Sequence, residues 1–242
     1  MKQKTAIGIA VGFALFAVLL AWLGTRTAPA TSETGSLLPD LRNTEKGITI
    51  TKEDHLLGSP NALVFLVVYT DFQCPFCTEY HQTLRTVMDI YGPSGEVAVV
   101  YRHMPLVQLH PHSPTYHLAS ECVYESAGDT GFWDFADSVF ENSETKGAAS
   151  STVLAVLATN AGADLQQFTT CMKEERYKEK VQASFDAGWN MGIRSTPYTV
   201  LVTPYQEIVL NEIRSFKTIG ASLETILRNL RDDPKLQEGA QS

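Results

Sequence analysis

Two cysteines separated by two residues are the most chemically informative feature of this chain. Cys74 and Cys77 enclose Pro75 and Phe76, directly after an apolar run at 62–69 and at the start of an amphipathic helical pattern. Such a junction places the first sulfur at a helix N-terminus, where unpaired N–H groups and the helix dipole favour the thiolate. The second cysteine lies on the same face of the first turn, close enough to form a disulfide. The pair therefore predicts thiol–disulfide oxidoreductase chemistry.

Half of a zinc site is the alternative interpretation of this motif. Structural zinc takes four ligands, commonly from two such cysteine pairs. The remaining cysteines, Cys122 and Cys171, stand alone in the sequence. We therefore favour redox chemistry and expect no metal and no other cofactor.

A strand–helix–strand unit is predicted to position the motif. Pro75 suits the first turn of a helix, where its missing N–H costs nothing. Helical spacing of apolar residues continues to about residue 91, and a second buried strand is predicted at 97–101. Strands joined by such a crossover are parallel. Before this unit we expect an edge strand at 47–51 and a polar loop at 52–61.

The rest of the chain indicates a helical region and then a return to strands. Helices are predicted at about 113–127, 131–142, 151–160 and 164–189. Strands follow at 196–202 and 207–210, then a helix at 222–231 and a disordered tail at 232–242. The class is therefore α/β: a small sheet that is split by a helical insertion at about 113–190.

The N-terminal segment indicates a membrane anchor. Lys2 and Lys4 precede an uncharged run at 6–24 that nearly matches a bilayer core of about 30 Å. The positive flank predicts that residues 1–5 are cytoplasmic and that the body lies outside the cytoplasm. A cleaved signal peptide is the alternative, but its apolar region is usually about 7–15 residues long. We expect an uncleaved, single-pass anchor in the cell membrane and a flexible linker at 25–46.

Composition excludes one class of partner. The 242 residues are 44% hydrophobic, enough for a core, and carry a formal charge of −8. An acidic protein of this kind is not expected to bind nucleic acid.

Several separated stretches resemble the DsbA-like branch of the thioredoxin superfamily. They are 57–62 and 69–77 around the cysteines, 110–111, 121–122 and 131–135 in the helical region, and 192–197. The resemblance runs from about residue 45 to 231. It implies a thioredoxin fold with an inserted helical domain over 47–231, and thiol–disulfide exchange outside the cytoplasm.

The resemblance also implies roles for individual residues. Cys74 is expected to be the exposed nucleophile and Cys77 the buried resolving thiol. Composition alone favours a trans bond before Pro197, because only about 5–6% of such bonds are cis. The resemblance instead implies a cis bond, with the backbone of Thr196 free to pair with an extended substrate.

This sequence departs from the family pattern at two places. The family often carries a buried acid six residues before the first active cysteine, where this chain has Val68. Asp71 could serve instead, or it could be a surface residue. Phe76 stands where the most oxidising relatives have histidine, so we expect the Cys74 pKa to be less strongly lowered than theirs.

Cys122 and Cys171 both fall on predicted helices of the insertion. In an oxidising compartment they predict a structural disulfide that closes a loop of about 50 residues. A second redox relay is the alternative.

Four of the six histidines fall within a short segment, at positions 103, 110, 112 and 117. A metal site is possible there. Their spacing includes no i, i+4 pair, and two prolines interrupt the segment. We interpret it as a polar loop.

These observations predict a membrane-tethered oxidoreductase that forms disulfides in exported proteins and is recycled by a membrane redox partner. A reductase or isomerase that uses the same site is the first alternative. A chaperone or binding module with an incidental disulfide is the second, and the paired cysteines argue against it. The direction of electron flow cannot be read from the residues.

Overall fold

The computed structural model describes residues 47–142, 150–210 and 215–239. The predicted anchor at 6–24 and the linker at 25–46 lie outside this part. Among the described residues, no helix is both long enough and apolar enough to span a bilayer.

A sheet of five strands forms the centre of the described part, in the order β1-β3-β2-β4-β5. The strands are β1 (His55–Gly58), β2 (Val64–Thr70), β3 (Val97–His103), β4 (Tyr198–Val202) and β5 (Glu207–Val209). As predicted, β2 and β3 are parallel, and the other neighbours are antiparallel. All seven residues of β2 are buried, which explains why its sequence is apolar without alternation.

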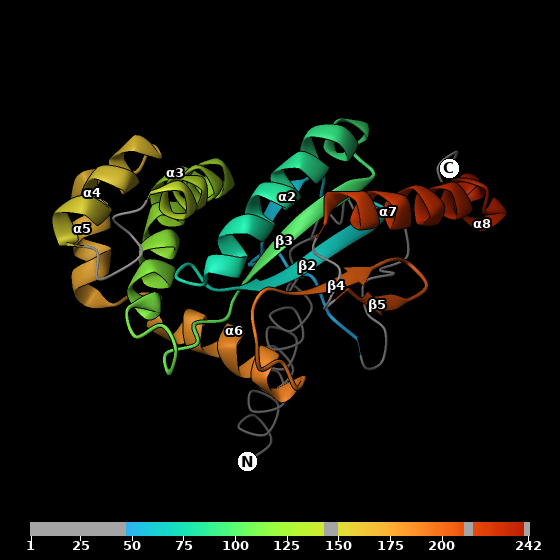
Figure 1. Cartoon of the computed structure of the whole chain (residues 1–242). Helices are drawn as coiled ribbons and strands as arrows, with labels where there is room; N and C mark the ends of the chain where they lie inside the picture. Colours follow the sequence, from blue (N-terminus) through green and yellow to red (C-terminus); the bar gives the residue numbers. More distant parts are fainter. Residues whose placement is uncertain (1–46, 143–149, 211–214, 240–242) are drawn as a thin grey trace, which may run out of the picture. The chain divides into compact units, whose positions relative to one another are not determined.

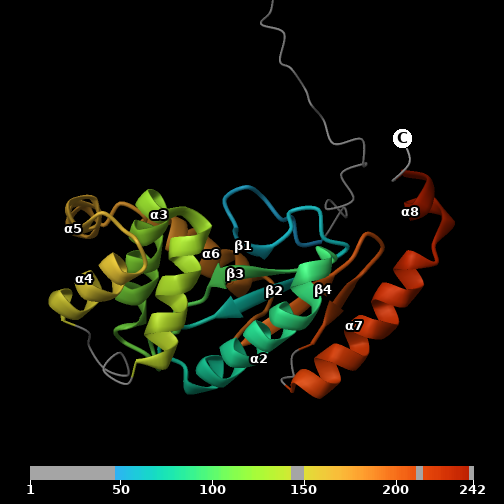
Figure 2. The ribbon, with the colours of Figure 1, turned by 90° about the horizontal axis from the view of Figure 1, so that it is seen from above.

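Helices cover both faces of this sheet (Figures 1 and 2). α2 (Pro75–Tyr91) and α7 (Phe216–Arg231) lie on one face, and α6 (Lys178–Asn190) lies on the other. Alternate β2 residues enter the two cores: Leu66 and Val68 pack in the α2 and α7 core, whereas Val67 and Tyr69 pack in the core beside α6. The arrangement is the predicted α/β thioredoxin fold, and it places the N-terminus of α2 at the carboxyl end of β2.

The insertion between β3 and β4 is helical, as predicted. It consists of α3 (Ser113–Glu141), α4 (Ser151–Asn160), α5 (Leu165–Glu174) and α6. α3 is interrupted at Gly128, whose φ of 63° and ψ of −161° are not helical, within the gap predicted between 127 and 131. The single helix predicted at 164–189 is wrong, because Glu175 adopts a left-handed conformation with φ 48° and ends α5.

Two further differences concern the ends of the domain. The predicted edge strand at 47–51 is not a strand, and β1 forms instead within the predicted polar loop, where it pairs with β3. The predicted disordered tail contains a short helix, α8 (Pro234–Gly239). Its first residue is proline, which suits a helix start.

Candidate active site

Cys74 and Cys77 lie at the N-terminus of α2, at the end of the central strand. Cys74 is the residue that caps the helix, and its carbonyl accepts the N–H groups of Cys77 at 3.0 Å and Thr78 at 3.2 Å. Both cysteines are free thiols. The expectation of an exposed nucleophile is wrong for this dithiol form, because Cys74 is only 4% exposed and Cys77 1%.

The proline loop covers the reactive sulfur. The Thr196–Pro197 peptide bond is cis. The Cys74 thiol donates to the carbonyl oxygen of Thr196 at 3.5 Å. In the thiol form of Cys74 the Thr196 carbonyl is therefore occupied, and the loop that lies against the sulfur explains the low exposure of Cys74.

The two thiols have opposite acidities. A hydrogen bond from Cys77 is the main cause that lowers the pKa of Cys74 to about 6. The side chain of Thr196 and the backbone N–H groups of Cys77 and Phe76 lower it further. Burial raises the pKa of Cys77 well above its usual value, and its hydrogen bond to Cys74 adds to this. At neutral pH Cys74 is therefore a thiolate and Cys77 a thiol, which is the state required for attack by Cys74.

Phe76 lies between the two cysteines and is 57% exposed. Its ring can supply neither a hydrogen bond donor nor a charge to the Cys74 thiolate. The stabilisation of the thiolate therefore comes from Cys77, from the side chain of Thr196 and from the helix N-terminus that starts at Pro75.

Asp71 is buried, which answers the question left open by the sequence. Its two carboxylate oxygens accept four hydrogen bonds, from the backbone N–H groups of Gln73 and Leu106, the Ser113 hydroxyl and His110 Nδ1. The carboxylate therefore fixes the segment that joins β3 to α3 beside the active site. Val68 is also buried and lies in the same core as Cys77.

The other cysteine pair forms a disulfide in the insertion. Cys122 of α3 and Cys171 of α5 are bonded, with Cα atoms 5.7 Å apart and a sequence separation of 49. Both cysteines are fully buried. Their disulfide ties α5 to α3 within the helical region.

A buried polar cluster was missed by the sequence reasoning. Glu121 Oε1 accepts from Nε2 of His55 at 2.8 Å and of His103 at 2.7 Å, and Oε2 accepts from Lys180 at 2.8 Å. His117 Nδ1 lies 2.7 Å from His103 Nδ1. The interpretation of this histidine segment as a polar loop is therefore wrong for positions 103 and 117.

His55, His103 and Glu121 could hold a metal, since their ligand atoms lie within 4.8 Å of one another. The Lys180 ammonium already neutralises the carboxylate, and each short contact is satisfied as a hydrogen bond. The cluster joins residues of β1, β3, α3 and α6, so no local spacing could have indicated it.

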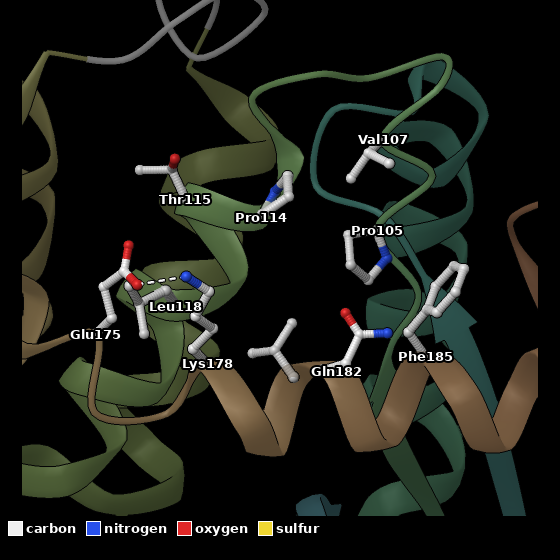
Figure 3. A pocket seen from close by; sticks show the side chains of 10 residues that line it. Pro105, Val107, Pro114, Thr115, Leu118, Glu175, Lys178, Gln182 and Phe185 are labelled. Atoms are coloured by element: carbon white, nitrogen blue, oxygen red, sulfur yellow. Dashed lines mark hydrogen bonds and ion pairs between the residues drawn. The ribbon is translucent and has the colours of Figure 1, made fainter.

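A separate groove lies beside the active-site region, between the segment after β3, the start of α3 and α6 (Figure 3). Its volume is about 310 Å³, and Val107, Leu118 and Phe185 contribute to largely apolar walls. The ion pair of Lys178 and Glu175 lies at one end, as Figure 3 shows. Neither the cysteine pair nor the cis-proline loop lines this groove.

Solved structures with this fold come from several bacteria. Oxidised BdbD from Bacillus subtilis matches with a TM-score of 0.64 and 21% identity, over 72% of this chain and 93% of that one. DsbA from Chlamydia trachomatis matches with a TM-score of 0.64 and 19% identity, over 79% of this chain and 100% of that one. At these identities the likeness establishes a shared fold.

Curated relatives are larger proteins. A Na(+)/H(+) antiporter NhaA from Herminiimonas arsenicoxydans is 27% identical over 197 residues, which are 81% of this chain and 30% of the antiporter. The antiporter NhaA 1 from Mycolicibacterium gilvum is 30% identical over 136 residues, which are 56% of this chain and 21% of that protein. This chain thus spans less than a third of the length of these antiporters.

A family model described as Thioredoxin matches residues 50–217, from before β1 into α7. This range includes the cysteine pair, the whole insertion and the cis-proline loop. The chain therefore belongs to the thioredoxin family.

Proposed function

We propose that this protein is a thiol–disulfide oxidoreductase that forms disulfides in exported proteins through Cys74 and Cys77. The observation that carries the proposal is the contrast between the two sulfurs: a thiolate-forming Cys74 at a helix N-terminus, against a buried Cys77 that retains its proton. A pair of this kind separates the attacking sulfur from the resolving sulfur.

The oxidative half-reaction starts from the Cys74–Cys77 disulfide. A substrate thiolate attacks Cys74 Sγ, the Cys74–Cys77 bond breaks, and Cys77 leaves as a thiolate that takes up a proton. A second substrate thiolate then attacks the substrate sulfur of the mixed disulfide, and Cys74 leaves as a stabilised thiolate. The substrate has lost two electrons and gained a disulfide, and the enzyme is left as the dithiol.

Thr196 and Pro197 are proposed to bind the substrate chain during this exchange. Their loop lies against Cys74, where the Thr196 carbonyl is within hydrogen-bond reach of the sulfur. As a thiolate, and again in a mixed disulfide, Cys74 carries no S–H donor. The carbonyl is then available to accept a backbone N–H from an extended substrate, as in strand addition.

An extracytoplasmic location and a membrane tether are part of the proposal. The Cys122–Cys171 bond supports an oxidising compartment, where structural disulfides persist. The uncharged run at 6–24 behind Lys2 and Lys4 supports a single-pass anchor with a cytoplasmic N-terminus. A membrane redox partner would then reoxidise the Cys74–Cys77 pair.

A reductase or isomerase is the competing function, and the Cys74 pKa of about 6 keeps it in contention. Cysteines of the strong oxidant DsbA and of the reductant thioredoxin have pKa values of about 3.5 and 7. The corresponding potentials are about −120 and −270 mV.

The reduction potential of Cys74–Cys77, measured by equilibration with glutathione buffers, decides between these functions. We expect a value between those two limits, because the Cys74 pKa of about 6 also lies between those of the two reference proteins. A potential at or below about −270 mV would favour the reductase instead.

Trapping experiments test the roles of the two cysteines. Cys77→Ser should accumulate mixed disulfides with substrate proteins, because no resolving thiol remains, and Cys74→Ser should form none. The opposite pattern would show that the roles are reversed.

A further inference from the structure

A small cavity lies directly behind Cys77, where the resolving thiol faces the protein interior. β2, α2, β3 and α3 contribute its lining, which consists of Val68, Thr70, Cys77, Tyr80, His81, Leu84, Val99, Tyr101 and Trp133. Its free volume is about 10 Å³. That is close to the minimum that holds one water molecule.

Two buried donors of this lining have no hydrogen-bond partner among the described residues. They are the Tyr101 hydroxyl and Trp133 Nε1, and each side chain belongs to a residue only 3% exposed. A buried donor without a partner destabilises the fold, because it has lost its hydrogen bond to water. One water can accept from both donors and can still donate two hydrogen bonds of its own.

Cys77 must exchange a proton in every cycle, and the nearby acids are already occupied. Asp71 accepts four hydrogen bonds. Glu121 accepts from two histidines and from Lys180. Burial raises the pKa of Tyr101 well above its usual value, so this phenol remains a donor. The family's acid position is Val68, which lines the cavity with an apolar surface.

His81 is the remaining proton acceptor in the described lining. It follows Cys77 by four residues on α2, and helical side chains lean toward the N-terminus, so it lies over the same face. The His81 Nε2 atom lies 2.5 Å from Asp137 Oδ1, and Arg85 Nε donates to the same oxygen at 2.7 Å.

Burial raises the pKa of Asp137, but the hydrogen bonds from His81 and Arg85 outweigh the effect of burial and hold this pKa below its usual value.

The ionised Asp137 selects one form of the His81 ring. A carboxylate accepts, so Nε2–H donates, and Nδ1 is the nitrogen left to take a proton in the neutral ring. The Asp137 side chain is 30% exposed, so the His81–Asp137 pair connects the cavity behind Cys77 to solvent. Tyr80 also lines the cavity, and its hydroxyl accepts from Thr199 at 2.9 Å.

We propose that this cavity holds one ordered water and that His81, acting through the water, supplies and removes the Cys77 proton. The inference rests on the proposed exchange reaction and assigns the route of its buried proton. His81 is a positioning and relay residue, because it does not touch the reacting sulfurs.

The Cys77 proton is accounted for in both the oxidative half-reaction and reoxidation. When a substrate thiolate breaks the Cys74–Cys77 bond, the water gives a proton to the leaving Cys77 thiolate and takes one from protonated His81. During reoxidation, Cys74 first forms a mixed disulfide with the oxidant. Neutral His81 then accepts a proton through the water as the Cys77 sulfur attacks Cys74, and the oxidant's thiolate leaves.

The test follows resolution of a mixed disulfide with glutathione. The reduced full chain is mixed with oxidised glutathione, quenched with acid and analysed by mass spectrometry from pH 5 to 9. In the wild type we expect resolution to level off toward high pH, because the relay then removes the Cys77 proton. In His81→Gln we expect resolution at pH 6.5 to slow at least tenfold, as for loss of a general base, and to rise about tenfold per pH unit.

Two controls separate relay from structure. Titration of the Cys74 thiolate at 240 nm should be nearly unchanged in His81→Gln, because His81 acts on the other sulfur. His112→Gln is the matched histidine variant: this residue is exposed and is not among the residues that line the cavity. It should reproduce the wild-type rates at every pH.

Equal rates and pH profiles in wild type and His81→Gln would overturn the proposal. If His81→Gln does not fold, Tyr101→Phe decides, since it removes only one hydroxyl that faces the water. We expect it to slow resolution severalfold, and an unchanged rate would also count against the relay. A wild type that never forms the glutathione adduct would instead refute the proposed exchange function.

Discussion

At the scale of single residues, Phe76 sets how far the Cys74 thiolate is stabilised. The pKa of about 6 arises mainly from the Cys77 hydrogen bond, and no charged group between the cysteines contributes. A more stable thiolate stabilises the reduced protein and makes the disulfide a stronger oxidant. The identity of residue 76 should therefore tune the potential without any change of fold.

We expect Phe76→His to lower the Cys74 pKa by about one unit, because an imidazole can donate a hydrogen bond or a charge to the sulfur. One pKa unit is about 1.4 kcal/mol, so the potential should rise by about 30 mV. Absorbance at 240 nm measures the first change, and glutathione equilibration measures the second. Phe76→Leu should leave both close to wild type. No upward shift in the histidine variant would mean that another group controls the thiolate.

Single residues also show what the sequence could indicate about the site. The cysteine motif was identified because its chemistry depends on local spacing, and Pro197 because its loop resembles that of the DsbA-like proteins. The i, i+4 relation of Cys77 and His81 was equally local and could have been noticed. The burial of Asp71 could not, because its partners Leu106, His110 and Ser113 come from a segment more than 30 residues away.

At the scale of elements, α3 connects the insertion to the sheet. Cys122 bonds α3 to α5, and the preceding residue, Glu121, contacts β1, β3 and α6. One turn of α3 therefore carries both a covalent and a polar attachment. The insertion should lose stability without the disulfide, while the cysteine pair on α2 should keep its chemistry.

The double variant Cys122→Ala, Cys171→Ala tests this separation. A disulfide that closes a loop of about 50 residues contributes roughly 3–4 kcal/mol on the chain-entropy model, so we expect a loss of that size in urea unfolding. The Cys74 pKa and the rate of attack on oxidised glutathione should stay within about twofold of wild type. A loss below about 1 kcal/mol, or a collapse of the exchange rate, would contradict the structural role.

The elements also show where sequence patterns fail. The long apolar run of β2 and the helical spacing of α2 were strong local signals, and both were predicted. β1 was missed because its short sequence owes its strand form to pairing with β3. The break between α5 and α6 was missed because Glu175 adopts a left-handed conformation that its residue type does not predict.

At the scale of the whole molecule, the cluster around Glu121 couples folding to pH. Burial lowers the pKa of His55 and lowers that of His117 well below its usual value. Burial raises the pKa of Glu121, but the hydrogen bonds from His103 and His55 outweigh this and hold it below its usual value. In the unfolded chain all three groups return to ordinary values.

The buried cluster around Glu121 makes the folded protein less stable at acid pH. As pH falls below about 6.5, unfolded His55 and His117 bind protons that the folded protein does not, so stability falls by up to about 2.7 kcal/mol per pH unit. Below about pH 4.5, Glu121 adds a further loss as its carboxylate protonates in the unfolded state. Urea unfolding from pH 8 to 5 measures the slope.

His117→Phe should reduce this slope by about half, whereas the exposed His112→Gln should leave it unchanged. A stability that stays constant between pH 7 and 5.5 in the wild type would show that the two buried histidines keep ordinary acidities. The cluster draws on four elements, so the whole domain rather than one helix should respond.

The Cys122–Cys171 bond has a consequence for how each copy of the protein matures. On the proposed side of the membrane a new chain arrives with four reduced thiols, and two of them must be joined before the helical region is secured. That joining is the same reaction that the finished site is proposed to perform on other chains. On the proposed function, the reduced Cys122 and Cys171 of a new chain are a substrate for copies that are already active, and a cell without any active copy would need another oxidant to form this bond.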